Sequence, residues 1–375
     1  MTTLRVIVDE MLAPSASIRR YTEELTRQLI ATAPHGVYVE GFVSASTEAE
    51  YADIVDRLPG LATLHKSSLA RRELSAAWQH GFTRLPGSGM VHATSLLAPL
   101  ARHDRLHDGD QIAVTVHDTV AWSHPDSLSP RQVSWQKGMA KRAQKYADAI
   151  VVPSHTVADQ LSELVDFGDR IRVISGAAST ALVLPVDADE RAAQLGLPDR
   201  YVLAIGGIEP RRGIDQLIRA MARIDADVPL LLVGPAADDA DLAAAIAEAG
   251  LPTERVRALG RLADPDLAVA IARAAVFAYP NIEEGFGMPI LEAFTLGTPV
   301  VHSDAPALLE LSADAGLPVE RDDEQGYPER LAAAIASVLD DAGLAERLKY
   351  SGLDRSHAYS WRNAAEKVWQ LHADL

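Results

Sequence analysis

Two glutamates flank a glycine-containing turn in the second half of the sequence. Glu284 and Glu292 are separated by seven residues, among them Gly285, Gly287 and Pro289. A proline can occupy the first turn of a helix, so this segment predicts a loop followed by a helix N-terminus, whose free N–H groups favour a diphosphate. The two carboxylates could accept hydrogen bonds from sugar hydroxyls. The pattern alone favours the alternative, a solvated loop acid and a helix-terminal acid.

Two adjacent arginines follow the first predicted strand of the second half. Arg211 and Arg212 come shortly after a glycine pair that includes Gly207. Adjacent guanidinium groups in a turn that opens a helix suit a diphosphate, because each can bind phosphate oxygens in a bidentate manner. They would also stabilise the negative charge that develops on a departing phosphate. An exposed basic turn is the alternative interpretation.

An imidazole stands at the end of a strand in the first half. His117 directly follows the apolar run 112–116, and Asp118 comes next. Ligands of open α/β sheets bind outside the carboxyl ends of the strands, and histidine is suited to hydrogen-bond a hydroxyl near neutral pH. A lone histidine at such a place is more often structural. Asp118 is expected to orient the local backbone.

Short apolar runs alternate with helical patterns throughout the chain. Predicted strands cover residues 4–8, 37–43, 112–116, 149–152 and 171–174, then 201–205, 230–233, 256–259, 275–279 and 299–302. Predicted helices cover residues 21–31, 132–146, 214–224, 239–249, 265–274 and 289–295. This alternation predicts an α/β fold with parallel sheets covered by helices on both faces.

The alternation is interrupted once, over residues 175–200, by a stretch rich in glycine, proline and polar residues. We place an interdomain linker there. The sequence then predicts two doubly wound Rossmann-like domains facing a cleft, one over residues 1–180 and one over 181–355, with 356–375 as a closing segment. Strand ends at the cleft are where the glutamates, the arginines and His117 are expected to lie.

The composition excludes several classes of function. The 375 residues include 35 Lys and Arg against 52 Asp and Glu, a net charge of −17, and no cysteine. Disulfides, thiolate metal sites and a cysteine nucleophile are therefore excluded, and a nucleic-acid partner is not expected. The start of the chain has too short an apolar stretch for a signal peptide, and no run could span a bilayer. We expect a cytoplasmic protein, with peripheral contact at the inner face of the membrane as an option.

In combination, these motifs resemble those of the retaining GT-B glycosyltransferases of family 4 (glycosyl transferases group 1). EGFGMPILEA followed by FTLGTPVV resembles the E-x7-E signature, VLAIGGIEPRRGIDQLIRAM the donor-phosphate segment, and AVTVHDTVAW the His-Asp segment. ADAIVVPSHTVADQL and VRALGRLADPDLAVAIARAAVFAYP also match the family pattern. YSWRNAAEKVWQLH resembles the closing segment, which commonly crosses back to the first domain.

The resemblance implies retaining transfer of a hexosyl group from a nucleotide-sugar to a glycan, lipid-linked or small-molecule acceptor. GDP-mannose is the expected donor, with UDP-sugars next, and neither a cofactor nor a catalytic metal is implied. Glu284 and His117 would contact the transferred sugar, Glu292 the ribose, and Arg211 and Arg212 the diphosphate. The remaining donor-binding positions are Gly207, Gly260, Leu262, Gly285, Phe286, Gly287 and Met288. The leaving phosphate would help to deprotonate the acceptor on the same face of the sugar.

The first strand–helix junction departs from the family pattern. Ser17 and Arg19 stand where relatives commonly have the glycines of a Gly-Ile-Gly-Arg-Tyr turn, whereas Arg20 and Tyr21 match. The resemblance makes this segment the acceptor or phosphate loop, so the two replaced glycines predict an altered acceptor or lost activity. The alternative functions are a non-catalytic partner subunit, a lectin-like protein, or another GT-B reaction such as a phosphorylase or epimerase.

Other patterns carry less weight. Asp-x-Asp pairs begin at Asp187, Asp225 and Asp264, and His103 and His107 are four residues apart, but neither pattern predicts a metal site in its context. Two basic groups are predicted to be solvated faces, with an anionic lipid surface or lipid-linked acceptor as the alternative. They comprise Lys66, Arg71, Arg72 and Arg84 around Trp78, and Lys137, Lys141 and Lys145 at helical spacing.

Overall fold

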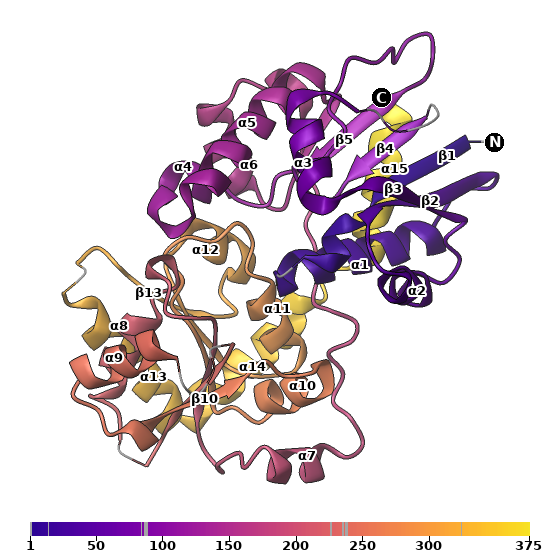
Figure 1. Cartoon of the computed structure of the whole chain (residues 1–375). Helices are drawn as coiled ribbons and strands as arrows, with labels where there is room; N and C mark the ends of the chain where they lie inside the picture. The colour runs from indigo at the N-terminus through magenta and orange to yellow at the C-terminus, as the bar shows by residue number, and fades with distance from the viewer. Residues whose placement is uncertain are drawn as a thin grey trace. The chain divides into compact units, whose positions relative to one another are not determined.

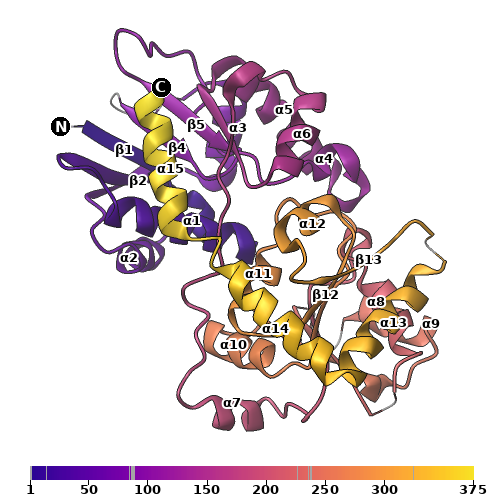
Figure 2. The ribbon, with the colours of Figure 1, turned by 180° about the vertical axis from the view of Figure 1, so that it is seen from behind.

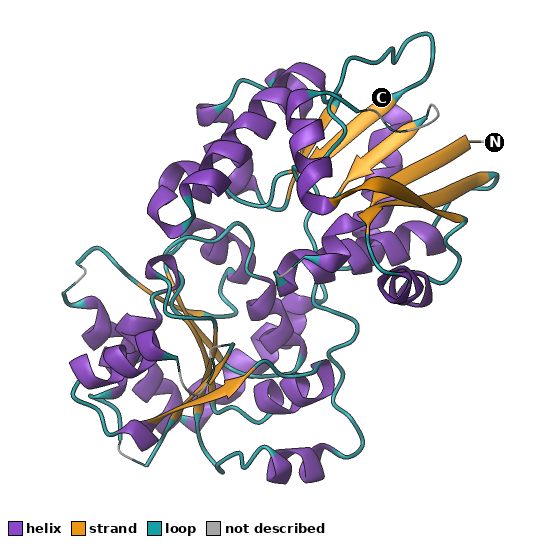
Figure 3. Cartoon of the chain, viewed as in Figure 1, coloured by secondary structure: helices purple, strands orange, loops and turns teal. Residues whose placement is uncertain are grey.

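The chain forms two compact units, each with its own parallel sheet (Figures 1 and 3). The structure, a computed structural model, describes residues 2–13, 15–83, 85, 89–225, 227–234, 236, 239–323 and 325–375. The first unit combines Met1–Gly176 with Ser360–Leu375, and the second unit is Ala177–Tyr359. No helix among these described residues is long and apolar enough to cross a bilayer.

The first unit is built on a seven-stranded sheet in which every described neighbouring pair is parallel, in the order β3-β2-β1-β4-β5-β6-β7. The strands are β1 (Thr2–Ile7), β2 (Val37–Ala45), β3 (Thr63–Ala70), β4 (Met90–Ala93), β5 (Gln111–Thr115), β6 (Ala149–Val152) and β7 (Ile171–Val173). The order reverses between β1 and β4. The carboxyl ends of strands at such a switch point are where open α/β sheets bind ligands.

Helices cover both faces of this sheet (Figures 1 and 2). On one face lie α1 (Ala16–Ala31) and α15 (Trp361–Asp374), joined where Trp369 Nε1 donates to Thr32 Oγ1 at 3.2 Å. The opposite face is covered by α3 (Arg71–His80), α5 (Pro130–Tyr146) and α6 (His155–Leu164), whose apolar side chains form one core with the strands. The shorter elements are η1 (Asp9–Leu12), α2 (Glu48–Arg57), α4 (Val120–Ser123), η2 (Pro125–Ser127) and η3 (Gly168–Arg170).

The second unit repeats the plan with a six-stranded parallel sheet among its described residues, in the order β10-β9-β8-β11-β12-β13. The strands are β8 (Val202–Ile205), β9 (Leu230–Val233), β10 (Val256–Gly260), β11 (Val276–Tyr279), β12 (Val300–Ser303) and β13 (Leu317–Val319). Here the order reverses between β8 and β11. The loops after these two strands therefore flank the switch point.

The helices of the second unit also form two layers (Figure 1). The core cluster on one face is made by α8 (Ile214–Met221), α9 (Ala240–Glu248) and α13 (Tyr327–Asp340). The other layer contains α10 (Asp264–Ala272), α11 (Met288–Thr295) and α14 (Ala342–Ser356). The remaining helices are α7 (Ala188–Gln194), η4 (Pro210–Arg212), η5 (Thr253–Arg255) and α12 (Pro306–Ser312).

The structure corrects several predicted elements. β3, β4 and β13 were not predicted, because β3 is a polar edge strand and the other two have only four and three residues. The stretch predicted as a linker contains α7. α1 begins at Ala16 rather than at residue 21, because the segment before Tyr21 contains neither glycine nor proline from Ala16 onward and continues the helix.

Candidate active site

The loops after β8 and β11 are joined at the switch point of the second unit. The Ile282 backbone N–H donates to the Arg211 carbonyl at 2.7 Å. Gly213, with φ of 62°, ends the arginine turn so close to the next loop that a Cβ there would lie 2.5 Å from the Pro280 carbonyl oxygen. Only glycine fits this approach without a shift of the backbone. The arginine turn and the glutamate loop therefore form one substructure.

Glu284 is oriented by two buried neighbours. The Tyr279 hydroxyl donates to Glu284 Oε2 at 2.6 Å, and Asn281 Nδ2 donates to the same oxygen at 2.8 Å. Burial raises the pKa of Tyr279 well above its ordinary value and the Glu284 charge adds to this rise, although Arg212 opposes it. The hydroxyl therefore remains a donor. Glu284 Oε1, which accepts a longer bond of 3.3 Å from Gly285 N, is the oxygen better placed to accept from a ligand.

Both arginines are paired with one carboxylate. Glu209 Oε2 lies 3.2 Å from Arg211 Nη2 and 3.2 Å from Arg212 Nε. Burial lowers the pKa of Arg212, but the nearby Tyr279, Glu209 and Glu284 raise it more, so that it lies above its ordinary value. The arginine side chains are 20% and 26% exposed, whereas Glu209 is 48% exposed. A more highly charged anion could therefore replace Glu209 at two guanidinium groups that are already in place.

The helix α11 starts directly after the Glu284 loop. Gly287 is its N-cap with φ of 99°, and a Cβ there would lie 2.7 Å from Leu308 Cδ2. Gly285, Phe286 and Met288 are buried beside it, and the Phe286 ring meets the Tyr359 ring edge-on at 5.6 Å. Glu292 is buried within α11. The first-turn N–H groups of α11 thus lie next to the glutamate loop.

The predicted donor-binding positions fall into two groups along the same edge of the sheet. Gly207, the arginine pair and Glu284 follow β8 and β11, which are neighbours. Gly260 ends β10 with φ of 66°, and its carbonyl accepts from Gly234 N, just after β9, at 2.9 Å. Leu262 follows and is half-buried. Gly260 and Leu262 are therefore two strands away from the arginines, at the same carboxyl edge.

In the first unit, His117 is hydrogen-bonded within its own unit. Its Nε2 donates to the Thr94 carbonyl at 2.7 Å, and its ring meets Tyr21 edge-on at 4.7 Å. Burial lowers the pKa of His117, despite the opposing Thr94 bond and the charges of Asp118 and Glu10. A neutral ring that donates from Nε2 has Nδ1 as an acceptor. Asp118 accepts from Val120 N at 3.0 Å, the local role predicted for it.

A buried acidic pair at the first switch point was missed by the sequence analysis. Asp9 and Glu10 follow β1 after Val8 and are 0% and 6% exposed. Arg71 binds both, with Nη2 2.7 Å from Glu10 Oε2 and Nη1 at the Asp9 carboxylate. Ser95, just after β4, donates to Glu10 Oε1 at 2.6 Å. The one sequence signal for this pair was that two acids stand just after the first predicted strand, at the edge of the sheet where ligands bind.

This ion-pair cluster also corrects the first basic group. Arg71 is paired with the buried acids, Lys66 pairs with Glu48 at 3.1 Å, and Trp78 is buried. Arg84 lies outside the described residues. Among the described members of this group, Arg71 and Lys66 therefore bind acids of their own unit, whereas Arg72 is exposed, as predicted for a solvated face.

The acceptor or phosphate loop is a helix rather than a turn. Ser17, Arg19 and Arg20 lie in the first turns of α1, and Arg19 N donates to the Ser15 carbonyl at 3.1 Å. Ser17 is exposed, while Arg19 and Arg20 are half-buried. Replacing the glycines has removed the residues that would allow a left-handed turn, so the chain enters the helix early.

The residues considered for metal binding have other partners. Asp187 and Asp266 bind Arg191, Asp189 binds Arg273, and Asp225 accepts from Asp227 N. His103 pairs with Asp148 and His107 with Asp104. Within the described parts of the chain, no group of three or more His, Asp or Glu side chains is arranged to hold a metal ion.

Two family models match the two units in turn. The model described as Glycosyltransferase Family 4 matches residues 18–182, and the one described as Glycosyl transferases group 1 matches residues 187–355. The chain belongs to glycosyltransferase family 4. Its two parallel Rossmann-like sheets confirm the predicted α/β architecture of the GT-B fold.

Individual relatives of this glycosyltransferase agree with that assignment. It is 29% identical to O-antigen chain mannosyltransferase B of Escherichia coli over 70% of each chain. It is 26% identical to the MMP alpha-(1->4)-mannosyltransferase of Mycolicibacterium hassiacum, over 81% of this chain and 78% of the relative. The structure of Anabaena HepE in complex with UDP-glucose is similar over 100% of both chains, with a TM-score of 0.74 and 17% identity, which supports the fold. Glycosyl transfer is thus the chemistry of its family.

Proposed function

We propose that this glycosyltransferase transfers a hexosyl group, mannosyl first among the candidates, from a nucleotide-sugar to a glycan, lipid-linked or small-molecule acceptor, with retention and without a metal. The observation that carries the proposal is the joined Arg211–Arg212 and Glu284 loops at the β8–β11 switch point, next to the α11 N-terminus. The names of the two curated relatives support mannose as the transferred sugar.

The donor diphosphate is proposed to bind between the arginine turn and the start of α11. Arg211 and Arg212 supply two fixed positive charges, and the α11 N-terminus supplies N–H donors. The diphosphate would take the place of Glu209, which is the most exposed member of its ion-pair cluster. The same guanidinium groups would then stabilise the charge on the departing nucleoside diphosphate.

The sugar and nucleoside contacts extend in two directions from that point. Glu284 would accept from a hydroxyl of the sugar through Oε1, since Oε2 is already bonded to Tyr279 and Asn281. Glu292 would bind the ribose, and the backbone near Gly260 and Leu262 would contact the base. In the first unit, His117 would accept from a sugar hydroxyl through Nδ1, because its Nε2 proton is used by Thr94.

The environment of Glu284 favours a binding role over nucleophilic attack. A double displacement would need a carboxylate nucleophile behind the anomeric carbon. Two strong hydrogen bonds fix and stabilise the charge of Glu284, which lowers its reactivity as a nucleophile. We therefore propose departure and attack on the same face of the sugar, with the leaving phosphate accepting the proton of the acceptor hydroxyl.

The positive charge on α1 bears on the acceptor. Arg19 and Arg20 lie in the opening turns of this helix, where N–H groups also favour an anion. This arrangement supports an acceptor that carries a phosphate or another acidic group. A non-catalytic or lectin-like protein remains the alternative if turnover is absent despite donor binding.

The test is a thermal-shift comparison of GDP, UDP, ADP and dTDP and their sugars. The wild type should be stabilised by one base in preference, and Arg212→Ala and Glu292→Ala should lose that response. Arg219→Ala, which removes an exposed arginine paired with Glu248, is the matched control and should respond as the wild type does. Full responses in both site variants, or no response in the wild type, would refute the donor site. Donor conversion without acceptor, or phosphate-dependent cleavage of a disaccharide, would instead indicate an epimerase or a phosphorylase.

A further inference from the structure

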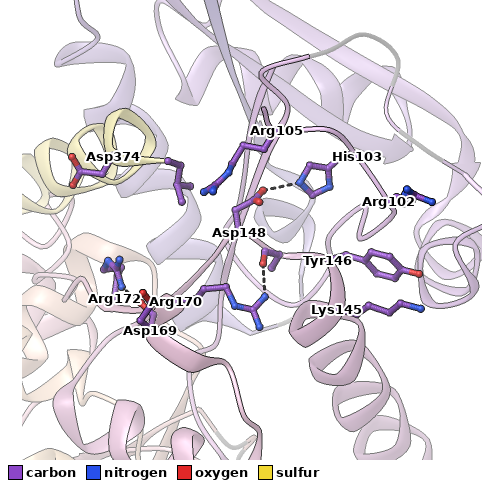
Figure 4. A pocket seen from close by; sticks show the side chains of 12 residues that line it. Arg102, His103, Arg105, Lys145, Tyr146, Asp148, Asp169, Arg170, Arg172 and Asp374 are labelled. Atoms are coloured by element: carbon purple, nitrogen blue, oxygen red, sulfur yellow. Dashed lines mark hydrogen bonds and ion pairs between the residues drawn. The ribbon is translucent and has the colours of Figure 1, made fainter. Parts of the chain in front are cut away.

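A pocket lies at the amino edge of the first unit's sheet. It encloses about 940 Å³ and is lined by the loop before β5, the residues before β6 and the start of β7 (Figure 4). The strands are parallel, so their amino ends share one edge and their carboxyl ends the other. Asp9, Ser95 and His117 lie at the carboxyl edge. This amino-edge pocket is therefore separate from the sugar-binding residues proposed for the first unit.

Five cationic side chains line the amino-edge pocket: Arg102, Arg105, Lys145, Arg170 and Arg172. None of the five is within ion-pair distance of a carboxylate belonging to the described residues. In contrast, many arginines elsewhere in the chain have such a partner, as Arg57, Arg191 and Arg321 do. In a protein with a net charge of −17, a group of unpaired cations at one concave surface indicates a site for an anion.

The floor of the pocket is held in place by hydrogen bonds. Arg170 donates to the carbonyls of Ala147 at 2.7 Å, Gln144 at 2.8 Å and Phe167 at 2.9 Å, so its guanidinium group is fixed before a ligand arrives. Figure 4 shows the Arg170 side chain below the His103–Asp148 pair. A fixed cation loses little conformational entropy when it binds an anion.

The acids of the pocket offset part of its positive charge and leave an excess of cations. Three carboxylates line it, from Asp148, Asp169 and Asp374. Asp148 Oδ2 accepts from His103 Nε2 at 2.8 Å and from Ile112 N at 2.8 Å. His103 Nδ1 faces the Ala101 carbonyl at 3.0 Å, so both ring nitrogens face acceptors and the protonated ring satisfies both. The Asp148 bond raises the pKa of His103, although burial opposes the rise.

We propose that the amino-edge pocket binds a small ligand through a phosphate monoester group. A dianionic phosphate matches several guanidinium and ammonium donors at once, and arginine can bind two of its oxygens. Arg102, Arg105 and Lys145 are exposed and can close around the phosphate, while Arg170 provides the fixed contact. The phosphate can belong to a soluble metabolite or to a lipid headgroup.

The test uses inorganic phosphate as the ligand, in isothermal titration calorimetry at constant ionic strength. The titration is done on Arg212→Ala, in which one of the two donor-site guanidinium groups is removed, so that binding at the donor site is weakened. One equivalent should bind, and adding Arg105→Ala with Lys145→Ala should weaken binding about tenfold or more, because two charge-assisted contacts are lost. Arg362→Ala, an exposed arginine of α15 paired with Glu366, is the matched control and should leave the affinity unchanged.

The outcomes separate the possible sources of the ligand. The protein is mixed with phosphatidylcholine vesicles that contain phosphatidic acid, and the vesicles are sedimented. If the wild type sediments with them and the Arg105→Ala/Lys145→Ala variant does not, the result would support the pocket and assign it to a lipid headgroup. Phosphate binding without such sedimentation would support a soluble ligand. Absence of phosphate binding in Arg212→Ala, or equal binding with and without the two pocket substitutions, would overturn the proposal. Circular dichroism of each variant establishes that it is folded.

Discussion

Replacing Tyr279 by phenylalanine tests whether the orientation of Glu284 matters for sugar transfer. The change removes the 2.6 Å hydrogen bond to Glu284 Oε2 and leaves the aromatic ring in place. Asn281 then remains as a side-chain donor to Glu284 Oε2, through its 2.8 Å bond. A hydrogen bond to a charged group contributes about 1.5–3 kcal/mol, so kcat/KM should fall by about 10- to 150-fold.

The assay separates the sugar contact from the diphosphate contact. GDP binding, measured by calorimetry, should stay within about threefold of the wild type, because Arg211 and Arg212 remain paired as before. The additional affinity for GDP-mannose over GDP, and the rate of GDP release from GDP-mannose, should both fall. If the thermal-shift screen selects another base, its sugar nucleotide takes the place of GDP-mannose.

Tyr201→Phe is a matched control within the same unit. The Tyr201 hydroxyl is also buried and donates to the Ala270 carbonyl at 2.7 Å, but it lies at the amino end of β8 rather than at the switch point. Both variants should lose about 1 kcal/mol or more of stability, and only Tyr279→Phe should lose activity. Equal activity in the two variants would refute the positioning role of Tyr279.

Three other perturbations have defined outcomes. Gly213→Ala should lower the melting temperature and abolish nucleotide stabilisation, because it costs about 1–2 kcal/mol for the left-handed backbone and also forces Pro280 away; a wild-type melting curve would contradict this. Burial lowers the pKa values of His92, His302 and His372 to about 3, 4 and 4. As the pH falls below 6.5, these histidines are therefore protonated in the unfolded chain while they stay neutral in the folded one, which favours unfolding. Stability should be constant above pH 7 and fall by about 2 kcal/mol per histidine at pH 5, as checked by urea unfolding; a flat profile from pH 7 to pH 5 would show that the rings are not buried neutral. EDTA treatment should change the rate of GDP release from GDP-mannose by less than about twofold, and rescue of a lost rate by Mg²⁺ would contradict the metal-free reaction.

The sequence was most informative where the candidate site residues come shortly after the strand that positions them. Glu284, Arg211 and Arg212 could be placed because each follows a strongly apolar run, and the structure brings those three into one cluster. Their roles toward the donor stay predictions. The GT-B architecture, in contrast, is confirmed, because alternating strands and helices constrain the topology strongly.

The sequence was least informative where burial depends on distant partners. Asp9 and Glu10 look like ordinary acids of an acidic chain, and their burial depends on distant partners such as Arg71, more than sixty residues later. The edge strand β3 has a polar composition because one of its sides is unpaired, so no apolar run marks it. The early start of α1 was not predicted, because Ser17 and Arg19 in place of glycines were interpreted as a changed loop rather than as the first turn of a helix.

The division of the chain has a consequence for its covalent connectivity. The chain leaves the first unit after Gly176 and re-enters it at Ser360, so the second unit is an insertion within the first. The two crossing points are close together, since a Cβ on Gly176 would lie 2.9 Å from the Trp361 ring. Residues 177–359 can therefore be excised as one continuous fragment, whereas the first unit needs residue 176 spliced to residue 360 to keep α15. A short splice suffices, because folding has already brought those two ends together.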